Sequence, residues 1–414
     1  MKSEQVLKDN DSDKKQKMMY NRFPPAEFVE KIYRKNRAVF VILLLIIGIA
    51  IRVGYNIPYH DPKQDFAADT YESRVFLNDY RDAYTKTQIE PRWPENSYFA
   101  KPECAPYPPV LLVVLSAIYY GMGGDAVDFY YFSIAFEFIT ALVLLLYCLM
   151  EDRIVPFICY YLNPVSIWFF GYFWHFTMTI FLFFIFSGMT LYRAGFKRAG
   201  MFFAGTAIAA KLFNIFLLAQ HRVKWIWLTW SAVILGLVVP YFIFDNYLSI
   251  FTFHSQRGLR FLMDSFTFTG GKYLAIGLIA LLYIGTIGVC LMIKRLEILR
   301  NYNTLEIMAG SMLPFAFLMG IQVASNYYIL MAMMLPTREV RRNILCFIMG
   351  FAGVFYSKNV PVWPWATVAS SAVFFGYIVY ENLQHSRLFD KTYSFEKEKE
   401  LWKKYIFGIK PLIE

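Results

Sequence analysis

The chain has 414 residues, of which 57% are hydrophobic, 19% aromatic and only 17% charged. Its apolar residues fall in runs of roughly 17–25, the length that crosses a bilayer as a helix, so the composition excludes an ordinary soluble domain and predicts an all-α polytopic membrane protein. The net charge of +10 does not indicate nucleic acid as a partner. The basic residues stand in short clusters between apolar runs, where they set membrane topology.

The N-terminal segment, residues 1–37, is rich in Lys and Arg and precedes a first apolar run at about 38–58. Basic residues flanking a first span place that end in the cytoplasm. No small-residue cleavage site follows the run, so we interpret it as a retained span rather than a signal peptide. Arg52, near its outer end, is expected either to reach loop carboxylates or a lipid phosphate, or to act as a simple interface anchor.

The following segment, 59–125, is predicted to be a large first outer loop. Its carboxylates are Asp61, Asp65, Asp69, Glu72, Asp79 and Asp82. The apolar stretch 108–122 is too short to cross the membrane and opens with Pro108 and Pro109, which indicates a juxtamembrane helix in the outer interface. Acid/base chemistry is therefore expected first in this loop.

Further spans are predicted at about 126–149, from Arg153 to about Phe170, and at about 172–192. The run 199–220 stands between two basic clusters, so it must leave and return. Two half-spans meeting near Lys211 and Asn214 would achieve this, because broken helices are tolerated at membrane depth where they line a cavity. The alternative is one continuous helix from which Lys211 snorkels.

A span at about 225–244 leads to a second outer loop, 245–270. With about twelve crossings in total, every basic cluster falls inside and both termini are cytoplasmic. The predicted organisation is a cytoplasmic segment at 1–37, a transmembrane domain at 38–381 and a cytoplasmic tail at 382–414.

Polar groups from distant parts of the chain are predicted to share the outer side. Besides the loop carboxylates they are His175, Lys211, His254, Arg257 and Arg260. Acids and cations together at the outer leaflet indicate a site that deprotonates one substrate and holds a phosphate on the other. Arginine suits a lipid phosphate because it binds bidentately, and lysine adds a point charge. Taken singly, each group also has an ordinary explanation as solvated surface or a headgroup-binding patch.

Several short motifs resemble one family in their order along the chain. They are the acidic first loop with Asp65, Asp69, Tyr71 and Phe76, then YPPVLLVVL at 107–115, LNP at 162–164, Gly171 to Thr179, AIAAKLFNIFLL at 207–218, FHSQRGLRFLMDSF at 253–266 and the late SNYYILMAMMLP. Together they resemble the GT-C superfamily of membrane glycosyltransferases. Within it, the similarity is to the polyprenol-phosphate-mannose-dependent branch of phosphatidylinositol-mannoside and GPI mannosyltransferases. Two features depart from the family pattern: the first loop has no Asp-x-Asp, and His175 stands where relatives often carry an amide or an acid.

The resemblance implies a GT-C fold and an enzyme that transfers a hexose, by the family's preference mannose, with inversion. The donor would be a polyprenyl-phosphate-linked sugar and the acceptor a hydroxyl of a glycolipid or glycan, without metal or other cofactor. Asp69 or Asp65 would be the catalytic base. Arg257, Lys211, His254 and Arg260 would hold the donor phosphate. Tyr107, Tyr327, Tyr328 and His175 would line the sugar or acceptor groove.

Two other functions fit the same pattern of spans. A transporter or flippase for a lipid-linked sugar needs the phosphate-binding cations but not the base, and internal inverted repeats, which would favour it, are not found. An assembly subunit of a surface polysaccharide also has many spans and large outer loops. An ion channel would need more ionisable residues within the spans than Lys211 and Glu137. The site is expected to face outside, and the membrane to be a prokaryotic plasma membrane.

Overall fold

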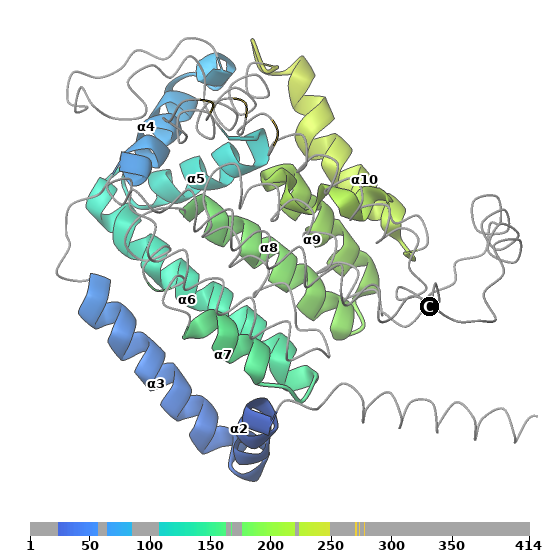
Figure 1. The fold of residues 1–414 in the computed structure, drawn as a ribbon. Coiled ribbons are helices and arrows are strands. Elements are labelled where there is room, and N and C mark those ends of the chain that lie inside the picture. The colour runs from blue at the N-terminus through green and yellow to red at the C-terminus, as the bar shows by residue number, and fades with distance from the viewer. Residues whose placement is uncertain are drawn as a thin grey trace, which may run out of the picture.

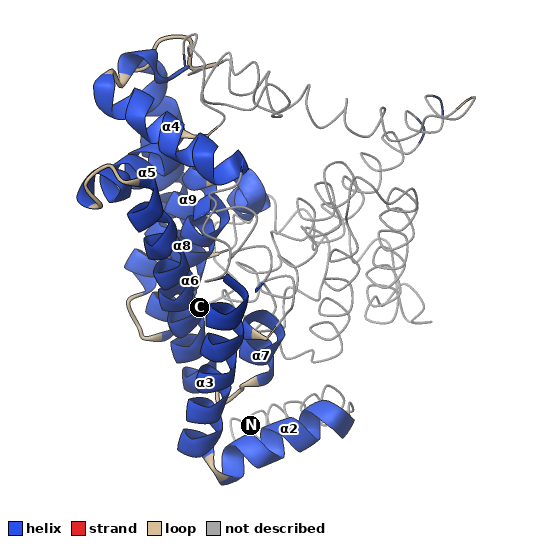
Figure 2. Cartoon of the chain, turned by 90° about the vertical axis from the view of Figure 1, so that its left-hand side faces the viewer, coloured by secondary structure: helices blue, strands red, loops and turns tan. Residues whose placement is uncertain are grey.

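The computed structural model describes residues 24–56, 64–84, 107–162, 176–219 and 223–248, with Ile167, Gly270, Tyr273 and Gly277 as single positions. Within these ranges the regular elements are helices and no β-strand occurs (Figures 1 and 2). Among the described residues, three helices are long and apolar enough to cross a membrane: α3 (Arg37–Asn56), α6 (Ala126–Met150) and α8 (Phe176–Arg193). The prediction of a helical membrane protein is confirmed to this extent. The later predicted spans lie outside the described ranges.

Capping explains where α6 begins and ends. The Asp125 side chain accepts hydrogen bonds from the backbone N–H groups of Val127 and Asp128, at 2.7 and 3.0 Å. A carboxylate in this position satisfies donors that have no partner inside the helix. At the other end the turn to the next helix places Asp152 at φ 54, in the left-handed region. The predicted span at about 126–149 therefore agrees with α6.

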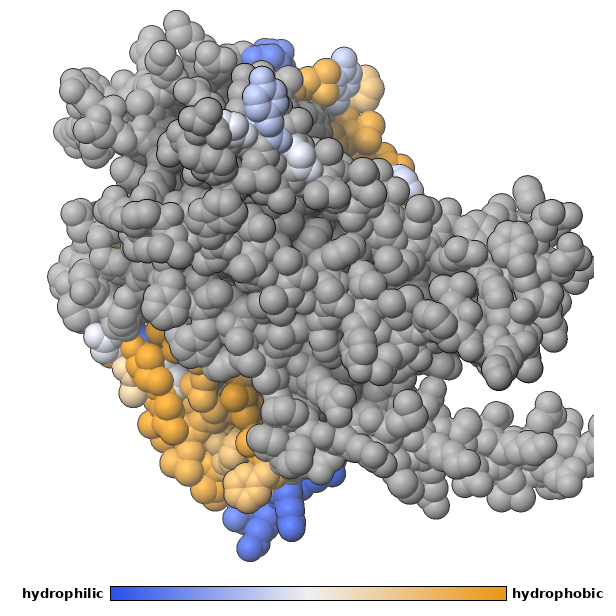
Figure 3. Space-filling view, in the orientation of Figure 1, coloured by the Kyte–Doolittle hydropathy of each residue, from blue (hydrophilic) through white to orange (hydrophobic). Residues whose placement is uncertain are grey.

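The N-terminal helix α2 (Pro24–Lys35) runs across the foot of α3, and the two stand at the edge of the bundle (Figures 1 and 2). Only 17% of the apolar α3 segment is buried. Its apolar surface is continuous and stops at the hydrophilic α2 (Figure 3). Such a sharp boundary is typical of a lipid-facing helix that meets the membrane interface at one end.

Charged contacts hold α2 to the start of α7 (Val155–Tyr161). The Glu30 carboxylate accepts hydrogen bonds from the backbone N–H groups of Ile154 and Val155, both at 3.0 Å. Arg37 forms an ion pair with Asp152 at 2.7 Å, and Arg34 reaches the same carboxylate at 3.5 Å. We call this part of the molecule, with the α6–α7 and α8–α9 turns, the α2 end of the bundle.

Helices α9 (Lys197–Ala210) and α10 (Ile226–Val233) pack side by side and run parallel. The Thr229 hydroxyl donates to the carbonyl of Met201 at 2.9 Å, and further along the pair Gly236 lies against Ala209. Residue numbers rise together along both helices, so the chain between them must turn back. The helical path of α10 continues through η4 (Ile234–Val238) and η5 (Val239–Phe242).

The turn back follows a break at Lys211. Helix α9 ends at Ala210, Lys211 has an extended backbone (φ −146, ψ 129), and η3 (Leu212–Ala219) follows. The predicted break near Lys211 is thus confirmed, and the alternative of one continuous helix is wrong. The side chain of Asn214 lies outside the described part.

The opposite end of the bundle, which we call the α4 end, is covered by α4 (Gln64–Asn78), η1 (Arg81–Tyr84) and α5 (Pro109–Gly121). Helix α5 begins at Pro109, the second residue of the Pro108–Pro109 pair. The N–H group at this first helical position has no partner inside a helix, so proline loses no hydrogen bond there. It packs against both α4 and α9 and buries Leu111, Leu112 and Leu115 completely. These leucines belong to a cluster with many aromatic residues, and partly buried side chains such as Phe76 extend it.

Candidate functional site

Helix α4 turns a polar face toward the bundle. Asp69 is only 1% exposed, and Thr70, Glu72 and Ser73 are buried beside it. The Ser73 hydroxyl donates to the backbone carbonyl of Asp69 at 2.7 Å, which fixes this turn of the helix. Burying carboxylates is costly, so a helix that does so at the end of an apolar bundle is a candidate for acid/base chemistry. Asp69 is one of the two bases that the sequence predicts, with Asp65, and its role as a base stays a prediction.

The first loop and the start of the second loop meet at the α4 end. The Tyr84 hydroxyl donates to the backbone carbonyl of Tyr107 at 2.7 Å, and the Asn246 amide donates to the carbonyl of Tyr84 at 3.2 Å. The rings of Phe244 and Tyr247 stand edge-on to Tyr84, with centroids 5.5 and 5.4 Å away. Segments about 160 residues apart are therefore joined by direct contacts.

Burial affects the chemistry of one member of this contact. The desolvation of Tyr247 raises the pKa of its phenol to about 12. The hydroxyl therefore stays protonated over the physiological range, as a neutral group able to donate and accept hydrogen bonds.

The structure brings Lys211 to the same end. Its amine lies 5.9 Å from the centre of the Tyr107 ring, and Tyr107 is itself buried at the start of α5. An ammonium at this distance from an aromatic face is weakly attracted to it, so the contact helps to hold the lysine beside Tyr107. Helix α9 ends at Ala210, which belongs to the same buried cluster as Tyr107. Lys211, the next residue, therefore lies beside this cluster.

The predicted site residues divide into three groups. Asp69 lies on α4, Tyr107 just before α5 and Lys211 directly after α9, and these helices pack in succession, α4 on α5 and α5 on α9. Asp65 lies in α4, one helical turn before Asp69, and its side chain is outside the described part. The others lie outside the described ranges: His175, His254, Arg257, Arg260, Tyr327 and Tyr328.

Among the described site residues, the α4 end holds one carboxylate, Asp69, and one ammonium, Lys211. A carboxylate can accept the proton of an attacking hydroxyl, and an ammonium can stabilise the charge on a departing phosphate. Within the described ranges, no three His, Cys, Asp or Glu side chains lie close enough to hold a metal ion. The metal-free mechanism implied by the resemblance stays a prediction.

A second polar cluster, which the sequence did not pair, lies between α3, α6 and α7. Arg52 is 4% exposed and Glu137 3%, and they share two hydrogen bonds, at 2.7 and 3.1 Å. Arg52 also donates to the carbonyl of Tyr161 at 2.9 Å and lies 4.2 Å from the centre of that ring. The Tyr160 hydroxyl donates to Glu137 at 3.2 Å.

These contacts correct both predictions made for Arg52. It neither reaches a loop carboxylate or lipid phosphate nor anchors at the interface, because Glu137 from another apolar helix neutralises it inside the bundle. The signal was present in the sequence as two opposite charges at matching depth. Counted at ~1.5 Å per residue, Arg52 and Glu137 both lie about 20 Å from the α2 end of their helices.

No family model matches this sequence, and neither a curated protein nor a solved structure shows significant similarity to it. The geometry of the α4 end and the motifs therefore carry the functional argument on their own. The GT-C resemblance remains a hypothesis about fold and activity.

Proposed function

We propose that the protein is an inverting membrane glycosyltransferase that moves a hexose, by the resemblance mannose, from a polyprenyl-phosphate donor to a hydroxyl of a glycolipid or glycan. The observation that carries the proposal is the buried carboxylate of Asp69 on α4, at the end of the bundle that also holds Lys211. The two come from segments far apart in sequence, α4 and the end of α9, and both helices pack against α5.

In this reaction Asp69 accepts the proton of the acceptor hydroxyl as its oxygen bonds to the anomeric carbon. The bond from that carbon to the phosphate oxygen breaks on the opposite face, which inverts the configuration. The polyprenyl phosphate leaves with the bonding electrons, and Lys211 stabilises its charge. Arg257, His254 and Arg260 are proposed as further phosphate ligands. Asp65 is the alternative base.

The proposal includes an orientation in the membrane. We place the α2 end in the cytoplasm, because Lys31, Arg34, Lys35, Arg37 and the basic α8–α9 turn lie there. The α4 end then faces outside, where a donor with its phosphate in the outer leaflet reaches Asp69. Both termini are cytoplasmic, in a prokaryotic plasma membrane with about twelve spans in a GT-C fold.

The test is transfer of radiolabelled mannose from polyprenyl-phosphate-mannose to membrane lipid extracts by the purified protein. Asp69→Asn is expected to abolish transfer while donor binding persists, and Asp65→Asn is compared in parallel. Asp79→Asn is the matched control, since Asp79 is exposed on the same loop and its bond from the Arg81 backbone N–H survives in the amide. Full transfer by both Asp69→Asn and Asp65→Asn would contradict the assignment of the base.

One observation favours a second function, a flippase for a lipid-linked sugar. The interrupted α9–η3 segment, with Lys211 at the break, is the kind of discontinuous helix that lines substrate paths in transporters. A flippase predicts that wild-type protein in liposomes moves a fluorescent polyprenyl-phosphate sugar across the bilayer without hydrolysis or transfer. It also predicts that Asp69→Asn retains this movement.

A further inference from the structure

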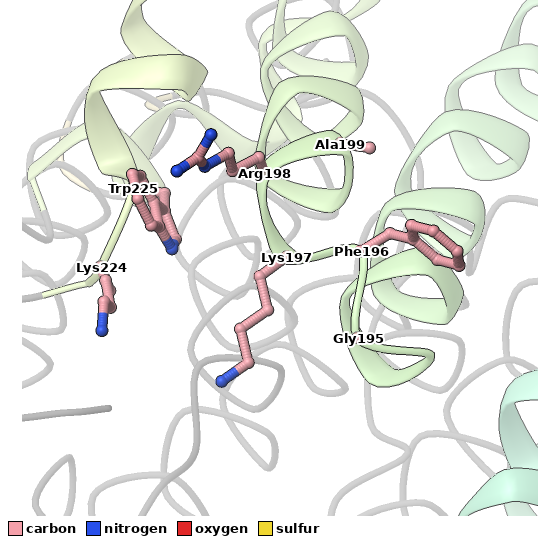
Figure 4. A pocket seen from close by; sticks show the side chains of 7 residues that line it. All are labelled: Gly195, Phe196, Lys197, Arg198, Ala199, Lys224 and Trp225. Carbon is pink, nitrogen blue, oxygen red and sulfur yellow. The ribbon is translucent and has the colours of Figure 1, made fainter.

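A cavity of about 480 Å³ lies at the α2 end, between the α8–α9 turn and the segment that leads into α10 (Figure 4). Three cations line it: Lys197 and Arg198 from the first turn of α9, and Lys224 from the segment before α10. Phe196 and Trp225 supply apolar wall. None of the described residues that line the cavity carries a carboxylate.

The charges around this cavity differ from three arginines nearby, Arg193, Arg34 and Arg37. Arg193 is paired with Glu151, and the arginines of α2 and α3 at this end are paired with Asp152. Within the part of the chain that the structure describes, no carboxylate pairs with Lys197, Arg198 or Lys224. Three positive charges therefore line the cavity without a counterion among the described residues. They lie at the N-terminus of α9, whose dipole adds to their positive potential.

One of the three cations, Arg198, is held by an aromatic contact. The Arg198 guanidinium lies 4.5 Å from the centre of the Trp225 ring, which fixes its plane and leaves its N–H edge available. Trp225 itself has φ 67, a conformation unusual for a bulky residue, directly before α10. In Figure 4 the side chains of Lys197 and Lys224 point to the same side of the cavity.

The position in the bundle indicates the depth of the ligand. The cavity follows Arg193, the last residue of the apolar helix α8, and the exposed Trp227 and Trp230 come directly after it in α10. Tryptophans gather at the level of lipid headgroups. Basic pockets between helices at this level suit phosphate-bearing headgroups, which match their charge and hydrogen-bond donors.

We propose that this cavity binds the phosphate of an anionic membrane lipid through Arg198, Lys224 and Lys197. The proposal stands apart from the proposed glycosyl transfer, whose residues lie at the α4 end. A lipid seated here would cross-link α9 and α10 at their first turns.

The test uses the full-length protein in a neutral detergent and measures its Tm and its bound lipids by native mass spectrometry. The probes are phosphatidylglycerol, phosphatidylcholine and inorganic phosphate. Phosphatidylglycerol is expected to raise the Tm and to remain bound, and phosphatidylcholine to do neither. Lys224→Gln is expected to weaken phosphatidylglycerol binding about tenfold, and the double variant Arg198→Gln/Lys224→Gln further, because each removes a charge-assisted hydrogen bond.

The matched control is Lys31→Gln/Lys35→Gln, which also removes two positive charges, but from exposed positions of α2 at the same end of the bundle. Retained binding in the control and loss in the cavity variants support the site. Equal loss in both pairs would show diffuse attraction and overturn it, as would no preference for phosphatidylglycerol in the wild type. Equal stabilisation by inorganic phosphate, without a further gain from lipid, would overturn the lipid as the source. Lys224→Gln leaves the Arg198–Trp225 contact intact, so its result does not depend on that contact.

Discussion

Arg52 and Glu137 form the most deeply buried charged contact in the described part of the chain. The guanidinium donates to the carboxylate of Glu137 and to the carbonyls of Gly48 and Tyr161, so its charge and its donors are both satisfied. In an apolar bundle the unpaired form of either residue would be far less stable than the pair. The contact therefore ties the lipid-facing α3 to α6 and α7.

Removing one partner is expected to be costly. Glu137→Gln leaves the buried Arg52 without a counterion, and we expect it to lower the free energy of unfolding by about 3–5 kcal/mol. The matched control is Glu151→Gln, which breaks the partly exposed pair with Arg193 and should cost less than ~1 kcal/mol. Thermal unfolding in detergent measures both. Similar shifts for the two variants would show that burial adds nothing to the Arg52 pair.

Glu30 predicts a pH dependence of the contact between α2 and α7. Burial raises the pKa of its carboxyl above the ordinary value of 4.5, although the N–H groups of Val155 and Ile154 partly oppose the shift. A raised pKa means that the folded state favours the protonated acid. Its contribution to stability is fully present below pH 4.5 and is lost as the pH rises through the raised pKa.

The measurement is the Tm of wild type and of Glu30→Gln at a series of pH values that begins below 4.5 and rises through the raised pKa of Glu30. Glutamine has no charge to desolvate, so the difference in Tm between the variant and wild type is expected to shift in favour of the variant as the pH rises. A difference that does not change with pH would contradict the raised pKa. Comparing the two proteins cancels the titration of the remaining groups.

At the scale of the helix, the crossing of α3 over α7 depends on Gly48. A methyl group there would overlap the ring of Tyr161, and this ring has little room to move. Its hydroxyl donates to the carbonyl of Leu45 at 3.1 Å, and one face stacks on Phe157 at 4.8 Å between centroids. Small residues at such crossings let helix backbones approach closely.

Gly48→Ala is therefore expected to destabilise the protein by about 1–3 kcal/mol, the usual effect of overpacking a close contact. Gly54 lies in the same helix with nothing within 4 Å of an added methyl, so Gly54→Ala is the matched control. It should be neutral or stabilising by up to about 1 kcal/mol, because alanine favours the helix. Thermal unfolding compares the two, and an equal effect would show that α3 does not pack on α7 as described.

Element bounds were predictable where one signal dominated. The start of α6 agrees with the apolar run predicted at about 126–149, and the break at Lys211 follows from basic clusters at both ends of one apolar run. The burial of α5 within the bundle was not predictable from its length. Its leucines pack under α4 because α4 offers a face beside them, and the sequence of α5 alone carries no information about that partner.

For the candidate site, the sequence named Lys211 as a phosphate ligand and Tyr107 as a groove-lining residue, and the structure places their side chains next to each other. It named Asp69 and Asp65 as alternative bases, and the structure buries Asp69. The roles of all four stay predictions. The contacts of Tyr84 with Asn246 were not foreseen. They join two loops through a backbone carbonyl and a side-chain amide, and neither group has a pattern that marks its partner. The predicted cations at 254–260 lie beyond the described ranges, so their distance from Asp69 stays a prediction.

At the scale of the whole molecule, the parallel packing of α9 and α10 predicts the membrane topology of the chain. Because the first turns of both helices meet at the Arg198–Trp225 contact, residues before each of them must lie on one side of the membrane. A cysteine at Ala194 and one at Lys224, placed in a background without the native cysteines, are expected to react with a membrane-impermeant maleimide from the same side. A cysteine at the exposed Asn78 of α4 is expected to react only from the opposite side.

Labelling of intact and of inverted vesicles distinguishes the sides, and labelling after solubilisation confirms that each thiol is accessible. If the Ala194 and Lys224 positions reacted from opposite sides, the chain between them would cross the bilayer once, and the break at Lys211 would not be a point of return.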